Sequence, residues 1–292
     1  MKKILITGAN SFIGTSFEQF LNETHPGEYI IDTLDMKDSA WKEKDFSIYD
    51  SVFHVAGIAH SDNGSISENK EKIYYTINTD LAIETAQKAK AEGVSQFVFM
   101  SSAIVYGDST KIGEDKIITK NTPLNPTNSY GNSKALAEKG LIPLDDEKFK
   151  VVILRPPMIY GKSCRGNYQL LVKISKLTPV FPYIKNQRSM LYVENLCEFV
   201  RLVIDNGEQG VFWPQNSELS NTSEFVKLIA LANNKKLVLL KGFTWLVKFM
   251  GLFFKSANKA FGNLVYDSSL STYKDNYCLY TLEESINKIE GE

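Results

Sequence analysis

A tyrosine and a lysine four positions apart are the residue pair of this sequence with the clearest chemical meaning. Tyr130 and Lys134 stand in the segment YGNSK, after Asn128 and Ser129, either of which can cap the start of a helix. Residues i and i+4 lie on one face of a helix, so the ammonium is expected beside the phenol, where it favours the phenolate. A tyrosine tuned in this way can act as a general acid and base near neutral pH.

A pair of serines precedes this helix and extends the same chemistry. Ser101 and Ser102 end the apolar run QFVFM. Ligands bind at the carboxyl ends of strands in open parallel sheets, so Ser102 is placed to hydrogen-bond a carbonyl or hydroxyl oxygen. An isolated YxxxK is more often an exposed helix face, but here it follows the serine pair and a glycine-rich turn, which favours the catalytic interpretation.

The glycine-rich turn is TGANSFIG, residues 7–14, between the first expected strand and the first expected helix. Its backbone N–H groups and the helix N-terminus can face a pyrophosphate. Ser11 takes the middle position of a GxxGxxG pattern, where its side chain narrows the approach of the phosphates or its hydroxyl replaces a lost contact. The expected cofactor contacts in the turn are Gly8, Asn10, Ser11, Phe12, Ile13 and Gly14.

An acid near the end of the second expected strand, residues 29–34, would hold the ribose hydroxyls of an adenosine. Asp32 and Asp35 both qualify, and Asp35 is favoured because it ends the apolar run. We count Met36 and Lys37 with Asp35 as cofactor-binding residues. Lys37 could pair with a 2′-phosphate, although a solvated loop lysine is commoner, so both NAD and NADP remain open.

The elements that must position these residues alternate along the chain. Continuous apolar strands such as KILIT, SVFHV and KVVIL suit a parallel sheet buried on both faces, and the helical segments between them indicate successive βαβ units. This predicts an α/β fold, a Rossmann-type doubly wound parallel sheet over residues 1–160. From about Gly161 loops lengthen and prolines appear, which predicts a small substrate-binding lobe over residues 161–292, partly interleaved with the first domain.

Composition excludes several classes of protein. The 292 residues carry 33 basic and 34 acidic side chains, so the strong basic surface of a nucleic-acid binder is missing. No signal peptide and no apolar run of about 20 residues is present, so we expect a cytoplasmic protein without an integral membrane span. Neither the cysteines nor the histidines have metal-site or disulfide spacing, and no metal is expected. These residues are Cys164, Cys197, Cys278, His25, His54 and His60.

One segment, FTWLVKFMGLFF at residues 243–254, is almost wholly apolar. It is too short to span a bilayer, and only Lys248 interrupts it, so it lacks the charged face of a helix that lies on a membrane. We therefore expect a buried cap helix or an oligomer contact rather than a membrane contact.

From Lys2 to about Glu292 the chain resembles the extended short-chain dehydrogenase/reductases, whose motif order it follows in TGANSFIG, HVAG, INTDLAIETA, SSAIVYG, YGNSK, LRPPMIYG and QRSMLYVENL. The resemblance implies that Ser102, Tyr130 and Lys134 form the catalytic triad. It implies that Lys134 also binds the nicotinamide ribose, and that Arg188 and Asn167 contact the diphosphate of a nucleotide substrate. The further cofactor contacts that it implies are Ala56, Gly57, Asn78, Ser101, Tyr130 and Pro157.

Within that family, LRPPMIYG, RGN, NQRSMLY and FGNLVYDSSL look most similar to bacterial nucleotide-sugar 4-ketoreductases of polysaccharide synthesis. The resemblance implies NAD(P)H-dependent reduction of a UDP-2-acetamido-2,6-dideoxy-hexos-4-ulose to UDP-N-acetylfucosamine or UDP-N-acetylquinovosamine, by a homodimer. A nucleotide-sugar 4-epimerase of the UDP-glucose or UDP-N-acetylglucosamine type is the leading alternative. A non-catalytic NADP-sensing protein is a second one, disfavoured because all three triad residues are present. The segment between the second strand and HVAG is shorter than the family's, which bears on cofactor preference.

Overall fold

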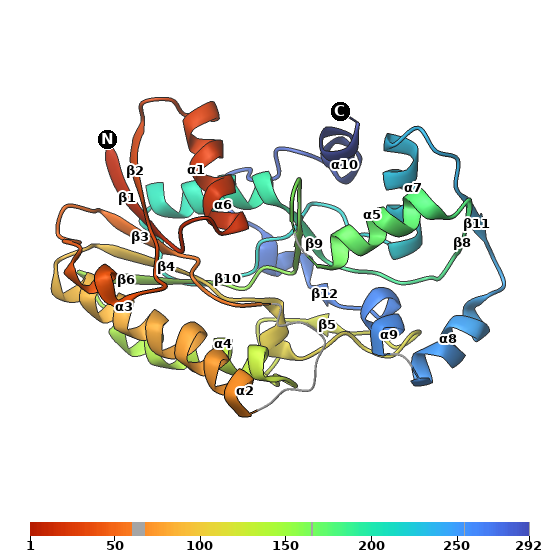
Figure 1. Ribbon diagram of the computed structural model, residues 1–292, viewed down its shortest axis with the longest axis horizontal. Coiled ribbons are helices and arrows are strands. Elements are labelled where there is room, and N and C mark those ends of the chain that lie inside the picture. The colour runs from red at the N-terminus through yellow and green to blue at the C-terminus, as the bar shows by residue number, and fades with distance from the viewer. Residues whose placement is uncertain (60–67, 165, 254, 292) are drawn as a thin grey trace. The chain divides into compact units, whose positions relative to one another are not determined.

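The computed structural model describes residues 1–59, 68–164, 166–253 and 255–291 (Figure 1). The chain divides into two compact units, each built from segments that are separate in the sequence. The first unit consists of residues 1–107, 123–156 and 196–214. The second unit consists of residues 108–122, 157–195 and 215–292.

A six-stranded parallel sheet forms the centre of the first unit, with strand order β10-β6-β4-β3-β1-β2. This confirms the expected Rossmann-type α/β fold. The strands are β1 (Lys2–Thr7), β2 (Tyr29–Leu34), β3 (Ser51–His54), β4 (Gln96–Met100), β6 (Lys150–Leu154) and β10 (Gly210–Phe212).

Helices cover both faces of this sheet, which makes it doubly wound (Figure 1). On one face lie α1 (Phe12–Thr24) and α6 (Val193–Asp205), and on the other lie α3 (Leu81–Ala91) and α4 (Ser129–Leu141). A further helix, α2 (Glu68–Tyr75), runs through a π-helical turn, Thr76–Asp80, into α3. The continuous apolar strands of the sequence are explained by this double covering, because both faces of each central strand are buried.

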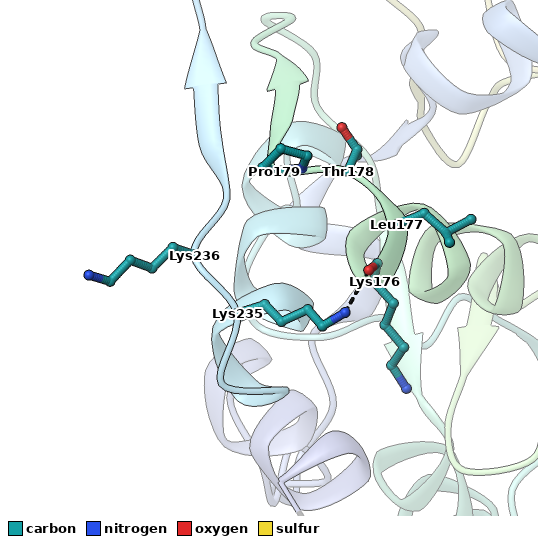
Figure 2. A pocket seen from close by; sticks show the side chains of 6 residues that line it. All are labelled: Lys176, Leu177, Thr178, Pro179, Lys235 and Lys236. Atoms are coloured by element: carbon teal, nitrogen blue, oxygen red, sulfur yellow. Dashed lines mark hydrogen bonds between the residues drawn. The ribbon is translucent and has the colours of Figure 1, made fainter.

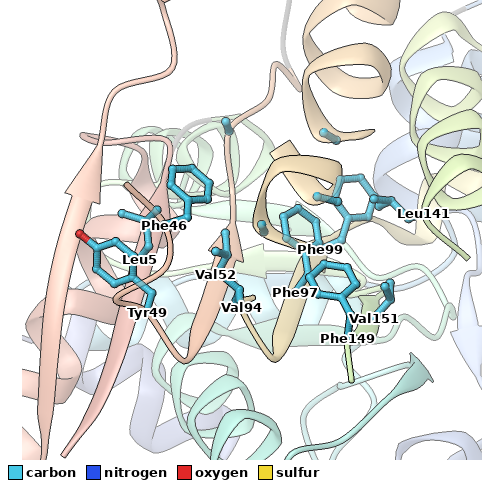
Figure 3. Packing of buried hydrophobic residues seen from close by; sticks show 14 of the residues in the cluster. Leu5, Phe46, Tyr49, Val52, Val94, Phe97, Phe99, Leu141, Phe149 and Val151 are labelled. Carbon is cyan, nitrogen blue, oxygen red and sulfur yellow. The ribbon is translucent and has the colours of Figure 1, made fainter. Parts of the chain in front are cut away.

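A hydrophobic core lies between the sheet and helices α3 and α4 (Figure 3). Phe97 and Phe99 of β4 are fully buried, and each contributes about 1.5–3 kcal/mol by removal of its ring from water. Small residues on α3 let that helix approach the sheet. They are Ala82, Ala86 and Ala89, which recur at the spacing of one helix face.

The order of the strands fixes where a ligand can bind. β1 lies between β2 and β3, so the chain reverses direction across the sheet at β1. In open parallel sheets the carboxyl ends of the strands at such a switch point border the ligand-binding crevice. The chain from β2 to β3 contains one short 3-10 helix, Ser39–Glu43, in the part where the sequence is unusually short.

The second unit contains short helices and three pairs of short parallel strands. The paired strands are β7 (Met158–Tyr160) with β9 (Met190–Tyr192), β8 (Val180–Pro182) with β11 (Val238–Leu240), and β5 (Ile117–Ile118) with β12 (Val265–Tyr266). The helices are α5 (Asn167–Leu177), α7 (Thr222–Ala232), α8 (Thr244–Phe253), α9 (Lys255–Phe261) and α10 (Leu282–Glu290). Tyr160, Tyr168 and Phe225 pack their rings together in its core.

The expectation that residues 243–254 form a buried helix is wrong for the described part of that segment. α8 buries Val247 but exposes Trp245, Phe249, Leu252 and Phe253. The reason is that α8 is apolar on both of its faces, and the sequence does not show which face the rest of the unit covers. Phe254 lies outside the described residues.

Across the described ranges, no helix combines the length and the apolar character that crossing a membrane requires.

Candidate active site

The glycine turn after β1 lies against the turn after β3. Gly8 has a positive φ of 105°, and a Cβ at Gly8 would lie 2.7 Å from the backbone nitrogen of Ala56. The amides of Gly8 and Ala9 donate to the carbonyl of Leu34 at 2.8 and 3.1 Å. The ends of β1, β2 and β3 therefore meet at this turn, and only glycine fits at position 8 without moving the backbone.

Ser11 caps helix α1, a contact that differs from both of the roles expected for it. Its hydroxyl accepts a hydrogen bond from the amide of Gly14 at 3.2 Å. The amides of Phe12 and Ile13, in the first turn, have no acceptor within the helix by its geometry. They and the helix dipole form an anion site with no acidic side chain in the first turn. Asn10, at a φ of 63°, completes the turn.

Asp35 lies directly after β2, at the same strand ends. Its carboxylate accepts from the amide of Lys37 at 3.0 Å and lies 3.5 Å from the Lys37 ammonium. Asp32 instead accepts from the phenol of Tyr49. The side chain of Met36 is buried in the core, which leaves only its backbone for a cofactor. Together with the Gly8 turn and the α1 amides, these groups fit the diphosphate and ribose of a dinucleotide.

The start of α4 brings Tyr130 to the strand-end serine. Asn128 caps this helix by accepting from the amide of Gly131 at 2.8 Å. A Cβ at Gly131 would lie 2.9 Å from the carbonyl oxygen of Ile104, so the glycine lets α4 approach the short helix that follows Ser102. The Ser102 hydroxyl lies close enough to the Tyr130 phenol to lower its pKa.

The charge state of Tyr130 differs from the expectation. Burial raises its pKa above the ordinary 10.0, and the Ser102 hydroxyl acts in the opposite direction. Lys134 is buried, and its ammonium donates to the carbonyl of Met100 at 2.7 Å and lies over the ring of Phe99. The expected lowering of the phenol pKa by Lys134 is therefore not found, because burial has the larger effect and the ammonium is directed to a backbone carbonyl.

Lys134 nevertheless lies beside the turn expected to border the cofactor. A Cβ at Gly57 would lie 3.4 Å from the Lys134 ammonium and 3.0 Å from the side-chain oxygen of Asn78. Burial lowers the pKa of Lys134 to about 8. A cation at this place can donate hydrogen bonds to ribose hydroxyls.

The side chain of Asn78 makes hydrogen bonds within the protein. Its side-chain oxygen accepts from the amide of Ile58 at 2.8 Å, and its side-chain nitrogen donates to Ser133 at 3.0 Å. Asn78 sits in the π-helical turn before α3, a deformation often found at functional sites. It joins the Ala56-Gly57 turn to α4, and its amide is already hydrogen-bonded to protein groups.

A buried polar network behind the site was missed by the sequence analysis. The hydroxyl of Ser101, a residue expected to contact the cofactor, donates to Glu138. Arg155 donates to Glu138 at 2.6 Å and to the phenol of Tyr106 at 2.6 Å. The only signal was the position of Glu138, four residues after Lys134 and on the same helix face.

The histidines that the structure describes have structural surroundings. His54 is fully buried and shares a 2.8 Å hydrogen bond with the hydroxyl of Thr7, and burial lowers its pKa to about 3. His25 ends α1 beside Glu28. His60 lies outside the described residues. Among the described side chains, no cluster of three His, Cys, Asp or Glu could hold a metal ion.

The residues expected to bind the substrate diphosphate belong to the second unit. Arg188 donates to the carbonyls of Lys259 and Gly262 at 2.6 and 3.0 Å, and burial lowers its pKa to about 10, so it is charged at neutral pH. Asn167 is exposed at the first residue of α5. Pro157, expected at the cofactor, is a buried residue of the same unit. Ser102, Tyr130 and Lys134 all belong to the first unit.

Comparison with known proteins follows this geometry. Residues 4–212 match the model of the NAD dependent epimerase/dehydratase family. A UDP-glucose 4-epimerase of Vibrio cholerae is 30% identical over 280 residues, covering 87% of this chain and 82% of the relative. An N-acetyl-alpha-D-glucosaminyl-diphospho-ditrans,octacis-undecaprenol 4-epimerase of Escherichia coli O157:H7 is 28% identical over 257 residues, covering 80% of this chain and 73% of the relative.

Solved structures share the fold at lower identity. A dTDP-4-dehydrorhamnose reductase from Bacillus anthracis, in complex with NADP, has a TM-score of 0.71 at 21% identity and covers 99% of both chains. A UDP-glucuronic acid 4-epimerase from Bacillus cereus, in complex with NAD, has a TM-score of 0.73 at 17% identity and covers 99% of this chain and 95% of that one. These likenesses agree with the Rossmann-type fold described above.

Proposed function

Because the chain belongs to the NAD-dependent epimerase/dehydratase family, we propose that Ser102, Tyr130 and Lys134 catalyse hydride-coupled chemistry at C4 of a UDP-sugar. The reaction we favour is reduction of the C4 carbonyl of a UDP-2-acetamido-2,6-dideoxy-hexos-4-ulose. Its product is UDP-N-acetylfucosamine or UDP-N-acetylquinovosamine, for surface polysaccharide.

The observation that supports Tyr130 as a proton donor is its burial in the first unit, close to Ser102. Its pKa is raised by burial, so the phenol holds its proton at neutral pH. Reduction of a carbonyl consumes one proton, which a protonated phenol supplies. An epimerase needs the same proton donor when it re-reduces the keto sugar, so this observation supports both candidates and the assay below distinguishes them.

Each residue of the site has its own role in the proposed reduction. The bound reduced nicotinamide supplies the hydride. Ser102 donates a hydrogen bond to the carbonyl oxygen on which negative charge develops, and Tyr130 gives that oxygen its phenolic proton. Lys134, whose ammonium also donates to the carbonyl of Met100, would donate to the nicotinamide ribose. The Gly8 turn, the amides of Phe12 and Ile13, and Asp35 would hold the rest of the dinucleotide.

Recognition of the nucleotide diphosphate is assigned in this proposal to the second unit. Arg188 carries the positive charge, held in place by two backbone carbonyls, and Asn167 stands at the start of α5. We keep as parts of the proposal the cofactor domain at residues 1–160 with a substrate lobe at residues 161–292 that is partly interleaved with it, and the cytoplasmic homodimer. Light scattering during gel filtration tests the dimer.

A 4-epimerase is the second candidate, supported by the names of two relatives with 30% and 28% identity. It would oxidise and re-reduce the same carbon without net use of the cofactor. The name of the Escherichia coli relative specifies a sugar on undecaprenyl diphosphate, so this candidate extends to lipid-linked sugars.

An assay with purified protein distinguishes the candidates. UDP-4-keto-6-deoxy-N-acetylglucosamine is offered with NADH and with NADPH, and the C4 configuration of the product is determined by NMR. The reductase oxidises one cofactor per sugar. Interconversion of UDP-glucose or UDP-N-acetylglucosamine without net cofactor use identifies the epimerase. Cofactor binding with no turnover of any of these sugars favours the non-catalytic sensor.

A further inference from the structure

A segment of the second unit is strongly basic, although the net charge of the whole chain is close to zero. Residues 225–266 contain no Asp or Glu, while the whole chain has a net charge of -1. We call residues 225–266 the lysine segment, and α8 lies within it. Its lysines are Lys227, Lys235, Lys236, Lys241, Lys248, Lys255 and Lys259.

Helix α8 presents an apolar face to solvent inside this segment. Trp245, Phe249, Leu252 and Phe253 recur at i, i+4, i+7 and i+8, which is one face of a helix. Their exposed fractions are 69, 55, 73 and 68%. Single exposed apolar residues are ordinary, but four large ones on one helix face form the kind of patch that marks a contact surface.

The opposite face of α8 is held by the unit, so the exposed face is not the result of an undocked helix. Val247 is 6% exposed. A Cβ at Gly251 would lie 2.8 Å from the side-chain oxygen of Asn258 and 3.4 Å from Ile112. Asn258 also donates to the carbonyl of Gly251 at 2.7 Å.

Several lysines of this segment keep their charges available. In the ranges that the structure describes, the exposed Lys236, Lys241 and Lys248 form no ion pair with an acidic side chain. Lys235 and Lys236 line a hollow of about 280 Å³ that also includes Lys176 (Figure 2). Lys235 donates to the backbone carbonyl of Lys176 at 2.6 Å, while Lys236 extends away from it (Figure 2).

We propose that the apolar face of α8 and the lysine segment bind the surface of a membrane that contains anionic lipids. Aromatic and leucine side chains enter the boundary between headgroups and acyl chains, and lysines that precede and follow them in the chain, such as Lys241, pair with lipid phosphates. The sequence analysis disfavoured a membrane contact because only Lys248 interrupts residues 243–254. The charge is supplied instead by lysines before and after that stretch.

A second copy of this chain is a poorer occupant of the surface. A two-fold interface places the same patch on both subunits, so the lysine segment would face itself with no acidic residue of its own to compensate. An anionic bilayer has the complementary charge. The proposal does not depend on which C4 reaction the site catalyses.

Sedimentation with vesicles tests the proposal on the full chain. We expect binding to vesicles of phosphatidylcholine with phosphatidylglycerol, at least about tenfold weaker binding to phosphatidylcholine alone, and weakening by salt. The emission of Trp245 should shift to shorter wavelength on binding, and Trp245→Phe should bind as well without that shift. Equal binding to both vesicle types, or no binding, would overturn the proposal.

Variants separate the surface from the fold. Phe249→Ser with Leu252→Ser should weaken vesicle binding at least about tenfold, and Lys241→Gln with Lys248→Gln should weaken it severalfold at low salt. Leu170→Ser is the matched control, since Leu170 is 53% exposed on α5 of the same unit. Unfolding temperatures establish that each variant is folded. A dimer that the Phe249/Leu252 variant dissociates, or an acidic protein that binds in place of vesicles, would contradict a membrane partner.

Discussion

The crevice at the ends of β1, β3 and β4 and the lysine segment around α8 are built in opposite ways. In the crevice, polar side chains such as Asn78 and Lys134 are buried and each is bonded to protein groups. On α8, large apolar side chains are exposed, and the lysines nearby stay in solvent. The first region is held in place from within the protein, which is what positioned catalysis requires. The lysine segment has large apolar side chains and lysines that the rest of the protein leaves exposed.

Turnover should separate the two regions most strongly. Tyr130→Phe removes the proton donor, so we expect kcat to fall by about 10²–10⁴ while cofactor binding changes little. Phe249→Ser on α8 should leave kcat on a soluble UDP-sugar unchanged. Steady-state kinetics and cofactor titration measure both effects. Retained activity in Tyr130→Phe would remove this residue from the mechanism.

Removal of a charge should also affect the two regions unequally. Glu138→Gln leaves Arg155 buried without its carboxylate partner, and we expect a loss of about 3 kcal/mol of unfolding free energy. Lys236→Gln removes an exposed charge and should change stability by no more than about 0.5 kcal/mol. Urea unfolding compares them. Similar losses in both variants would mean that the Glu138 network is not holding the site.

A glycine in each region tests how closely the backbone is packed. Gly8 and Gly242 both have positive φ, at 105° and 92°, but a Cβ would collide with Ala56 only at Gly8. Gly242→Ala should cost about 1 kcal/mol from backbone strain alone. Gly8→Ala should cost about 2 kcal/mol or more, and should also weaken cofactor binding. Equal costs would show that the Gly8 turn has room to relax.

Because Lys134 is buried, the stability of the protein depends on pH in a way that an exposed lysine would not cause. The pKa of Lys134 is lowered to about 8 in the folded protein from 10.5, so between these pH values the unfolded chain binds more protons and stability rises with pH. Below pH 8 the full cost of burying the charge is present. Lys134→Met should therefore stabilise the protein at pH 7 by about 1–3 kcal/mol, and its advantage should shrink toward pH 10.

Lys248→Met on α8 is the control for this comparison. It should show no such pH-dependent difference from the native chain, because Lys248 is exposed. A constant advantage of Lys134→Met across this pH range would place the effect in packing rather than in the charge of Lys134.

The parts of the fold that could be predicted depend on local patterns. Continuous apolar runs predicted the parallel sheet, and the residues before the catalytic helix included its cap, Asn128. The points where the chain passes from one unit to the other were harder to predict. β10, which belongs to the first unit, has only three residues. Its place beside β6 comes from pairing across the fold rather than from its own sequence.

The parts of the site that could not be predicted depend on burial. Glu138 and Arg155 are charged, so in the sequence they could not be told from solvated residues, yet they form a buried pair. Lys134 was expected to act on the phenol of Tyr130, but the depth of the helix directs it to the carbonyl of Met100. The exposure of α8 was missed for the converse reason, because apolar residues on both faces do not show which one is covered.

The central claim, transfer of a hydride to C4 with Tyr130 as proton donor, is tested most directly by isotope labelling. The protein is mixed with UDP-4-keto-6-deoxy-N-acetylglucosamine and a reduced nicotinamide that carries deuterium at its transferable position. We predict that NMR finds the deuterium at C4 of the product sugar for the native chain, and that Tyr130→Phe forms almost none of this product. A product without deuterium at C4, or no product with either NADH or NADPH, would contradict the account.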